Sequence, residues 1–327
     1  MGDQHLTARA KAWGLGLAVV STLCFGSSGA FAKALINAGL TPLQAVWLRV
    51  AGAALVLVPL TLVLRGTAGF RAARRSLPPL LLFGAAGVAG CQAFYFVAAS
   101  RLPVGVAILL EYTGPVMVVG WLRFVRRARV ARSAALGVAV ALAGVACVVQ
   151  IWAGLRLDGV GLLAGLGAAA AQAAYFLVAE RMGGETDPLV LTSAGFVVGA
   201  VVLTVVAAPW SIPWGLLPAD VAFADQHAPA WLIAAWIVVV STVIAYITSV
   251  LAVRRLSAPV AAAVSYPEAV FAALFAWVIL GERLTPVQLV GGLIVLAGAF
   301  IAQRAVSTKD PVAAAPSVPA PAPLAAR

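Results

Sequence analysis

The chain has 327 residues, of which 63% are hydrophobic and only 10% are charged. A soluble protein of this size needs far more polar side chains to cover its surface, so the composition excludes a soluble enzyme or binding domain and indicates a membrane protein. The net charge of +11 would suit a nucleic-acid-binding protein. The basic residues fall between apolar segments, however, where they act as topology signals, and no nucleic-acid partner is expected.

Ten apolar segments are each long enough to cross about 30 Å of hydrocarbon, which takes about 20 helical residues. In chain order they cover residues 13–35, 42–64, 77–100, 103–124, 133–152, 158–179, 188–208, 230–253, 258–280 and 285–303. The sequence therefore predicts an all-α integral membrane protein with ten transmembrane helices. After the last span, residues 305–327 are rich in Ala and Pro, and we expect a disordered tail.

The second half of the chain repeats the first. A shift of 154 residues superposes Arg101-Leu102 on Arg255-Leu256, Tyr112 on Tyr266, and Leu142-Ala143-Gly144 on Leu296-Ala297-Gly298. The two repeats, residues 12–152 and 156–304, each hold five spans, and an odd number of spans forces the second repeat to enter from the opposite face. This predicts a 5+5 inverted repeat, as in secondary transporters, with a site near the membrane midplane between the halves.

The basic residues also predict the orientation. With the N-terminus in the cytoplasm, 17 of the 22 Lys and Arg residues lie on the cytoplasmic side, and only Arg101, Arg156 and Arg283 lie outside. The remaining two, Lys33 and Arg49, lie within spans. Because cytoplasmic loops carry an excess of Lys and Arg, we expect a multi-pass protein of the inner or plasma membrane with both termini cytoplasmic. The longest outer segment is then 209–229.

Four ionisable side chains fall inside the predicted spans, and such groups are costly in lipid: Lys33, Arg49, Glu111 and Glu268. Lys33 is near the outer end of the first span and can reach the interface. Arg49 and Glu111 lie at similar depth and can pair. A structural ion pair and a functional site both explain these residues. In a functional site, the basic groups bind a carboxylate and the glutamates bind an ammonium group or a proton, so protons are the candidate coupling ion.

Polar and aromatic residues converge from six spans. With the four ionisable groups, the following complete the candidate substrate-binding or coupling residues: Ser27, Gln92, Tyr95, Tyr112, Gln172, Tyr175, Tyr246 and Tyr266. Each could alone be a packing residue, but their convergence favours a cavity. Pro115 and Pro267 stand beside the two repeat-related tyrosines, and we expect them to kink both halves at comparable depth.

Catalytic and metal sites are not expected. Neither histidine lies in a span, no aspartate lies inside a span beyond Asp158 at the first position of the sixth, and the HExxH and GxxxxGK[ST] motifs are missing from the sequence. Zinc chemistry, nucleophile–base chemistry and ATP hydrolysis by a P-loop therefore lack their residues. The three cysteines, Cys24, Cys91 and Cys147, lie in apolar segments and are interpreted as small buried hydrophobic residues. We expect no enzyme activity, no metal and no cofactor.

Several segments resemble the EamA-type drug/metabolite transporters. In the first half these are Phe25-Gly-Ser-Ser, Lys33, Thr41-Pro42 and Leu48-Arg49, and in the second half Ser265-Tyr-Pro-Glu through Gly281-Glu282-Arg283. The segment Leu110-Glu-Tyr-Thr-Gly-Pro115, with Ser241-Thr242 and Tyr246, is similar to the threonine/homoserine exporter branch. The resemblance covers roughly residues 12–304. The first half departs from it, with Arg126-Arg127-Ala128-Arg129 in place of the acidic turn at Glu282.

This resemblance implies a secondary transporter that exports small metabolites by alternating access, with amino acids as the leading substrate class. The alternative is a multidrug or lipophilic-cation exporter of the same fold, in which the glutamates and aromatic rings hold the cation. A scaffold or receptor that transports nothing is a third possibility. The expected partners are a small-molecule substrate and the lipid bilayer, and the oligomeric state is left open.

Overall fold

The computed structural model describes residues 2–73, 77–127, 130–150, 157–181, 187–223, 226–253, 256 and 266–307. In this part of the chain, nine helices are long and apolar enough to cross a membrane, and a shorter apolar helix covers residues 267–280. The nine are Ala12–Asn37, Pro42–Thr67, Leu77–Arg101, Val104–Phe124, Arg132–Val149, Gly159–Val178, Pro188–Ala207, Ala230–Ala252 and Pro286–Arg304.

These helices confirm the predicted all-α, multi-pass membrane fold, and their ends lie within a few residues of the predicted spans. The ninth predicted span begins in residues 257–265, which lie outside the described part of the chain. The predicted disordered tail lies outside it too, except for residues 305–307, which are helical.

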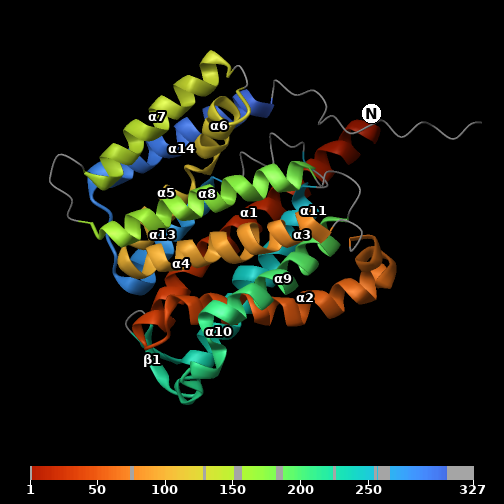
Figure 1. Cartoon of the computed structure of the whole chain (residues 1–327), viewed down its shortest axis with the longest axis vertical. Coiled ribbons are helices and arrows are strands. Elements are labelled where there is room, and N and C mark those ends of the chain that lie inside the picture. The colour runs from red at the N-terminus through yellow and green to blue at the C-terminus, as the bar shows by residue number, and fades with distance from the viewer. Residues whose placement is uncertain are drawn as a thin grey trace, which may run out of the picture.

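In its described part, the first half contains eight elements, of which Figure 1 labels all but η2: α1 (Gly2–Asn37), α2 (Pro42–Ala73), α3 (Leu77–Leu82), the π-helical segment η2 (Phe83–Gly90), α4 (Cys91–Arg101), α5 (Val104–Glu111), α6 (Gly114–Phe124) and α7 (Arg132–Val149). The second half contains α8 (Gly159–Arg181), α9 (Pro188–Ala207), α10 (Ala230–Val238), the π-helical segment η6 (Val239–Ile244), α11 (Ala245–Val253), α13 (Pro267–Leu280) and α14 (Pro286–Ser307).

The long connection after α9 contains the short 3₁₀ turns η4 (Pro209–Ser211) and η5 (Trp214–Leu216), followed by a β-hairpin. Strand β1 (Asp220–Phe223) pairs antiparallel with β2 (Gln226–Pro229), with Val221 opposite Ala228. The hairpin packs on the membrane-spanning core through the ring of Phe223, whose centroid is 4.8 Å from that of Phe31 in α1.

Two helices begin with the same capping arrangement. At the start of α2, the Thr41 backbone N–H donates to Gln44 Oε1 (3.0 Å) and the Gln44 N–H donates to Thr41 Oγ1 (3.2 Å). At the start of α14, Thr285 and Gln288 form the same two bonds at 3.0 and 3.2 Å. Each pair satisfies two backbone donors that the first helical turn leaves free, so both helices have defined starts.

The helix contacts are those expected of two equivalent halves. The fifth span, α7, packs on the tenth, α14, and the second, α2, packs on the seventh, α9. The third span packs on the sixth through the contact of α4 with α8. In the same way, the first span, α1, packs on the eighth, which consists of α10, η6 and α11. Exchanging spans one to five with six to ten reproduces these contacts. Figure 1 shows α7 and α14 on one flank and α2 and α9 on the opposite flank. The opposite membrane orientation of the halves stays a prediction.

The π-helical segments follow the same repeat. The 154-residue shift maps η2 onto residues 237–244, which include η6. The same shift maps Gln92 onto Tyr246 and Tyr95 onto Ser249, just after these segments. A π-helical turn changes the direction of the side chains that follow it, and such turns are frequent at functional sites. We therefore expect the residues after η2 and η6 to point toward a shared site.

Glycines allow α7 and α14 to pack with their backbones in contact. A methyl group placed on Gly298 would lie 2.7 Å from both the Ala141 Cα and the Gly137 carbonyl oxygen, which is closer than atoms can approach. Close backbone approach at small residues is a main source of helix association in membranes, where burial of apolar surface gives little driving force. The α7–α14 contact therefore depends on Gly298.

The variant Gly298→Ala is expected to lower the stability of the protein by about 1–3 kcal/mol, because the two backbones must separate. The matched control is Gly120→Ala in α6, where a methyl group meets no atom within 4 Å. Thermal unfolding of both variants in the same detergent tests this. An equal or higher unfolding temperature for Gly298→Ala than for the wild type would contradict the packing described here.

Candidate functional site

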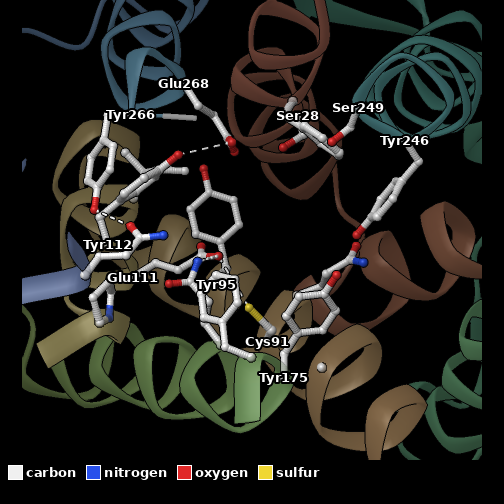
Figure 2. Close-up of a pocket in the computed structure, with 18 of the residues that line it drawn as sticks. Ser28, Cys91, Tyr95, Glu111, Tyr112, Tyr175, Tyr246, Ser249, Tyr266 and Glu268 are labelled. Carbon is white, nitrogen blue, oxygen red and sulfur yellow. Dashed lines mark hydrogen bonds between the residues drawn. The ribbon is translucent and has the colours of Figure 1, made fainter. Parts of the chain in front are cut away.

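A cavity of about 390 Å³ lies between helices of the two halves. Its wall contains Phe25, Ser28, Arg49, Gly87, Cys91, Gln92, Tyr95, Ile108, Glu111, Tyr112, Pro115, Gln172, Tyr175, Phe176, Tyr246, Ser249, Tyr266, Glu268 and Gln303. Ten of the twelve predicted site residues are in this list, and only Ser27 and Lys33 are missing from it. Figure 2 shows side chains from both halves surrounding the same space.

A break between two helices and the start of a third place the glutamates in the wall. Glu111 is the last residue of α5, and the chain turns at Tyr112 before α6 begins. Glu268 is in the first turn of α13, one residue after Pro267. Discontinuous helices of this kind commonly form transporter sites, because their ends present polar groups inside the membrane. The N-terminal end of α13 also favours the negative charge of Glu268.

The two prolines stand in the first turns of helices. Pro115 is the second residue of α6 and Pro267 is the first residue of α13. At these positions the missing N–H of proline is not needed by the helix. The predicted bend in the fourth span is therefore a full break between α5 and α6. Whether Pro267 bends the ninth span depends on residues 257–265, which are outside the described part of the chain.

The repeat-related tyrosines meet at the cavity, as predicted. The rings of Tyr112 and Tyr266 have centroids 5.5 Å apart and are inclined by 47°. The Tyr112 hydroxyl donates to Glu268 Oε2 (3.2 Å), and the Tyr266 hydroxyl donates to Gln303 Oε1 (2.8 Å), as the dashed lines in Figure 2 show. A tyrosine of the first half thus orients a carboxylate of the second.

Glu111 is held by two neutral donors. Its Oε1 accepts from the Cys91 thiol and from the Gln172 amide, both at 3.3 Å. The sequence analysis interpreted Cys91 as a small buried hydrophobic residue; it is buried, and its thiol also lies in the cavity wall and bonds to a glutamate. Within the described residues, neither Glu111 nor Glu268 lies within ion-pair distance of a basic side chain.

Arg49 is buried and held by the eighth span. Its Nε donates to Thr242 Oγ1 (2.9 Å), its Nη2 donates to the Ser241 carbonyl (3.4 Å), and its guanidinium lies 5.6 Å from the centre of the Phe96 ring. The expected direct pair between Arg49 and Glu111 is not formed among the described residues. Since Nη1 makes no hydrogen bond within this part of the chain, Arg49 retains a donor for a ligand.

Gln92 and Tyr95 are buried in the wall with only 8% and 4% of their surface exposed. Among the described residues, neither the two amide atoms of Gln92 nor the Tyr95 hydroxyl has a hydrogen-bond partner. In Figure 2 the Tyr95 phenol points into the cavity, toward Glu268. Buried polar groups without partners are rare in proteins and call for an explanation.

Ser27 and Lys33 have structural contacts outside the cavity wall. The Ser27 hydroxyl lies 2.7 Å from that of Ser241 and donates to the Cys24 carbonyl. Lys33 forms an ion pair with Glu282 Oε1 at 2.6 Å, and it donates to the Leu102 carbonyl at 2.7 Å. The predicted snorkelling of Lys33 to the interface is therefore replaced by pairing within the protein.

Glu282 was not among the predicted site residues. Besides pairing with Lys33, its Oε2 accepts from the Val104 backbone N–H (2.8 Å), so it connects the α13–α14 turn to the start of α5. We call these contacts the Lys33–Glu282 latch. The signal in the sequence was the acidic turn at Glu282 that the first half lacks.

Comparison with known proteins agrees with this architecture. The model of the EamA-like transporter family matches residues 12–150 and 159–303. The threonine/homoserine exporter RhtA of Escherichia coli strain K12 is 27% identical over 244 residues, which cover 73% of this chain and 73% of that protein. RhtA of Salmonella typhimurium strain LT2 is 26% identical over 237 residues, covering 70% and 72%.

Two further proteins are similar to this chain. The uncharacterized transporter YwfM of Bacillus subtilis strain 168 is 24% identical over 228 residues, covering 69% of this chain and 74% of that protein. A solved crystal structure shares 21% identity, with a TM-score of 0.56 over 90% of this chain and 98% of that chain. This likeness shows a shared fold.

Proposed function

Since the chain belongs to the EamA-like transporter family, we propose that it exports small amino acids and binds them as zwitterions in the cavity between its halves. The observation that carries this proposal is one cavity wall with a guanidinium, Arg49, and two carboxylates, Glu111 and Glu268, that form no ion pair with it. Opposite charges that are not paired with each other can bind the two charges of an amino acid.

The charge arrangement favours this class of substrate over a lipophilic cation. Arg49 has a free Nη1 donor for a carboxylate, and carboxylate recognition by arginine is strong because the bonds are charge-assisted. Glu111 and Glu268 can each accept from an ammonium group. The surrounding rings, including Tyr112 and Tyr266, add cation–π contacts. The same rings would suit a lipophilic cation, but Arg49 would repel it. The names of the RhtA relatives give the amino-acid class further support.

Alternating access is the expected mechanism, because each half makes the same helix contacts with the other around the cavity. Transporters built from two such repeats move one repeat against the other to open the site to each side in turn. The cavity wall reaches Gln303, near the end of α14. The Lys33–Glu282 latch lies at the other end of α14, just before its first residue, and ties the two halves together there. We infer that this conformation is closed at the latch. By the distribution of basic residues, the latch faces outward and Gln303 faces the cytoplasm.

Counterflow into proteoliposomes tests the function. Vesicles loaded with an unlabelled compound are supplied with a labelled one, from a panel of amino acids, sugars and cationic dyes, with and without a pH gradient. We expect accumulation of at least one small amino acid, and none in protein-free vesicles. Transport of the dyes with no amino acid flux would establish the cation exporter instead. A lack of transport of every compound would favour the scaffold or receptor.

Labelling of introduced cysteines tests the orientation. In a background without the three native cysteines, Gly215→Cys, in the long connection after α9, should react with a membrane-impermeant maleimide in intact cells. Gly215 is exposed. Arg126→Cys, also exposed and at the end of α6, should react only after lysis. The reverse pattern would place both termini outside.

A further inference from the structure

The geometry points to Gln92 and Tyr95 as the pair that selects the side chain of the substrate, by binding an uncharged group that both donates and accepts hydrogen bonds, a hydroxyl or a carboxamide. The inference rests on the proposed function and names the substrate class more closely. Both residues are more than nine-tenths buried, both line the cavity, and their side-chain polar atoms have no hydrogen-bond partner in the part of the chain that the structure describes.

The two residues act together because of their spacing. They lie three residues apart in α4, on one face of the helix immediately after the π-helical segment η2. Tyr95 is also fixed against α1, since a Cβ at Gly29 would collide with its hydroxyl and with Val104. The glycine therefore allows the phenol to pass close to the α1 backbone and reach its position in the wall.

The chemistry of the pair excludes the charged ends of an amino acid as its main ligand. A carboxylate only accepts, so it would leave the Gln92 Oε1 facing negative charge. An ammonium group only donates, so it would leave the Gln92 Nε2 facing positive charge. A carboxamide can pair with both amide atoms of Gln92, and a hydroxyl can donate to the amide oxygen or accept from the amide nitrogen and from the Tyr95 hydroxyl. Arg49, Glu111 and Glu268 meanwhile remain for the two charges.

Burial makes the pair selective. A site whose buried polar groups bond to a substrate hydroxyl rejects the analogue without it, since binding that analogue leaves those groups unpaired. Threonine and valine have nearly the same shape and differ by one hydroxyl. We expect the site to prefer threonine to valine, and asparagine to leucine, by about tenfold or more.

Competition during counterflow tests this in the wild-type protein and in two variants. Unlabelled threonine, valine, asparagine and leucine compete with the labelled amino acid that the panel identifies. Gln92→Met removes the amide but keeps the length of the side chain, and Tyr95→Phe removes only the hydroxyl. Both variants should lose most of the preference for threonine over valine. The inhibition constant of valine should stay unchanged or fall, because the variants remove groups that valine leaves unpaired, so a rise in it reports general damage to the site.

The outcomes separate the two proposals. Equal competition by threonine and valine in the wild type, with amino acid transport intact, overturns the selective role and leaves the proposed function standing. Persistence of the preference in both variants overturns the assignment to Gln92 and Tyr95. If no amino acid shows counterflow, the proposed function fails, and this inference fails with it. The wild-type comparison remains decisive if a variant does not fold.

Discussion

Replacing Glu111 with glutamine is expected to lower amino acid export driven by a pH gradient by about tenfold to a hundredfold, the usual loss when a hydrogen bond to a charged group is removed. Glutamine keeps the size of the side chain and the bonding possibilities toward Cys91 and Gln172, which hold Glu111 at 3.3 Å. It removes the negative charge that we assign to the ammonium group or to a proton. Flux measured in proteoliposomes over a range of external pH checks this expectation.

The matched control is Asp158→Asn, which removes a carboxylate paired with Arg101 at an exposed position. Surface ion pairs contribute little, so this variant should transport normally. Normal flux in Glu111→Gln, with unchanged pH dependence, would show that Glu111 takes no part in coupling. A lower unfolding temperature with unchanged transport per folded molecule would instead assign Glu111 a structural role.

Breaking the Lys33–Glu282 latch is expected to open the cavity from the side on which the latch lies. The pair is only 14% and 19% exposed, and Lys33 and Glu282 also bond to the backbone at Leu102 and Val104. Glu282→Gln keeps an acceptor for Val104 but loses the charge. Labelling of a cavity cysteine, Ser249→Cys, by an impermeant reagent from that side should rise about fivefold, the effect of losing about 1 kcal/mol.

Lys33→Met should raise the labelling similarly, and the double variant should add little, because both changes remove the same interaction. Asp158→Asn again provides the control, since its ion pair with Arg101 is exposed and measures 3.4 Å. Equal labelling in the wild type and in all latch variants would show that the latch does not close the cavity.

Much of the fold could be predicted from the sequence, because apolar length decides where a chain crosses a membrane. Nine of the ten predicted spans agree with the described helices to within a few residues, and Tyr112 and Tyr266, which the repeat relates, lie together in the cavity wall. The π-helical segments η2 and η6 could not be predicted. Apolar residues such as those in η2 suit an α-helix equally well, so composition carries no signal for the extra residue in the turn.

Most residues of the candidate site could be predicted from the sequence, but their hydrogen-bond and ion-pair partners could not. The free-energy cost of a charged side chain in lipid indicates that Arg49 and Glu111 face the protein interior. Because both residues lie at a similar depth in the membrane, the sequence also suggested that they form an ion pair. In the structure Arg49 donates a hydrogen bond to Thr242, and Glu111 accepts hydrogen bonds from Cys91 and Gln172. Depth in the membrane does not predict these partners, because the rotation of each helix about its axis decides which neighbour a side chain meets. Lys33 pairs with Glu282 for a similar reason, since the turn after α13 folds back over the end of α1.

Competition by truncated ligands tests whether a zwitterion binds between Arg49 and the glutamates. In wild-type proteoliposomes, counterflow of the labelled amino acid is measured against the intact compound, its amide without a carboxylate, and its hydroxy acid without an ammonium group. Both truncated compounds should compete at least about tenfold more weakly than the intact amino acid, because each leaves one buried charge unpaired. An amide that competes as well as the intact amino acid would contradict it and would indicate a cation site.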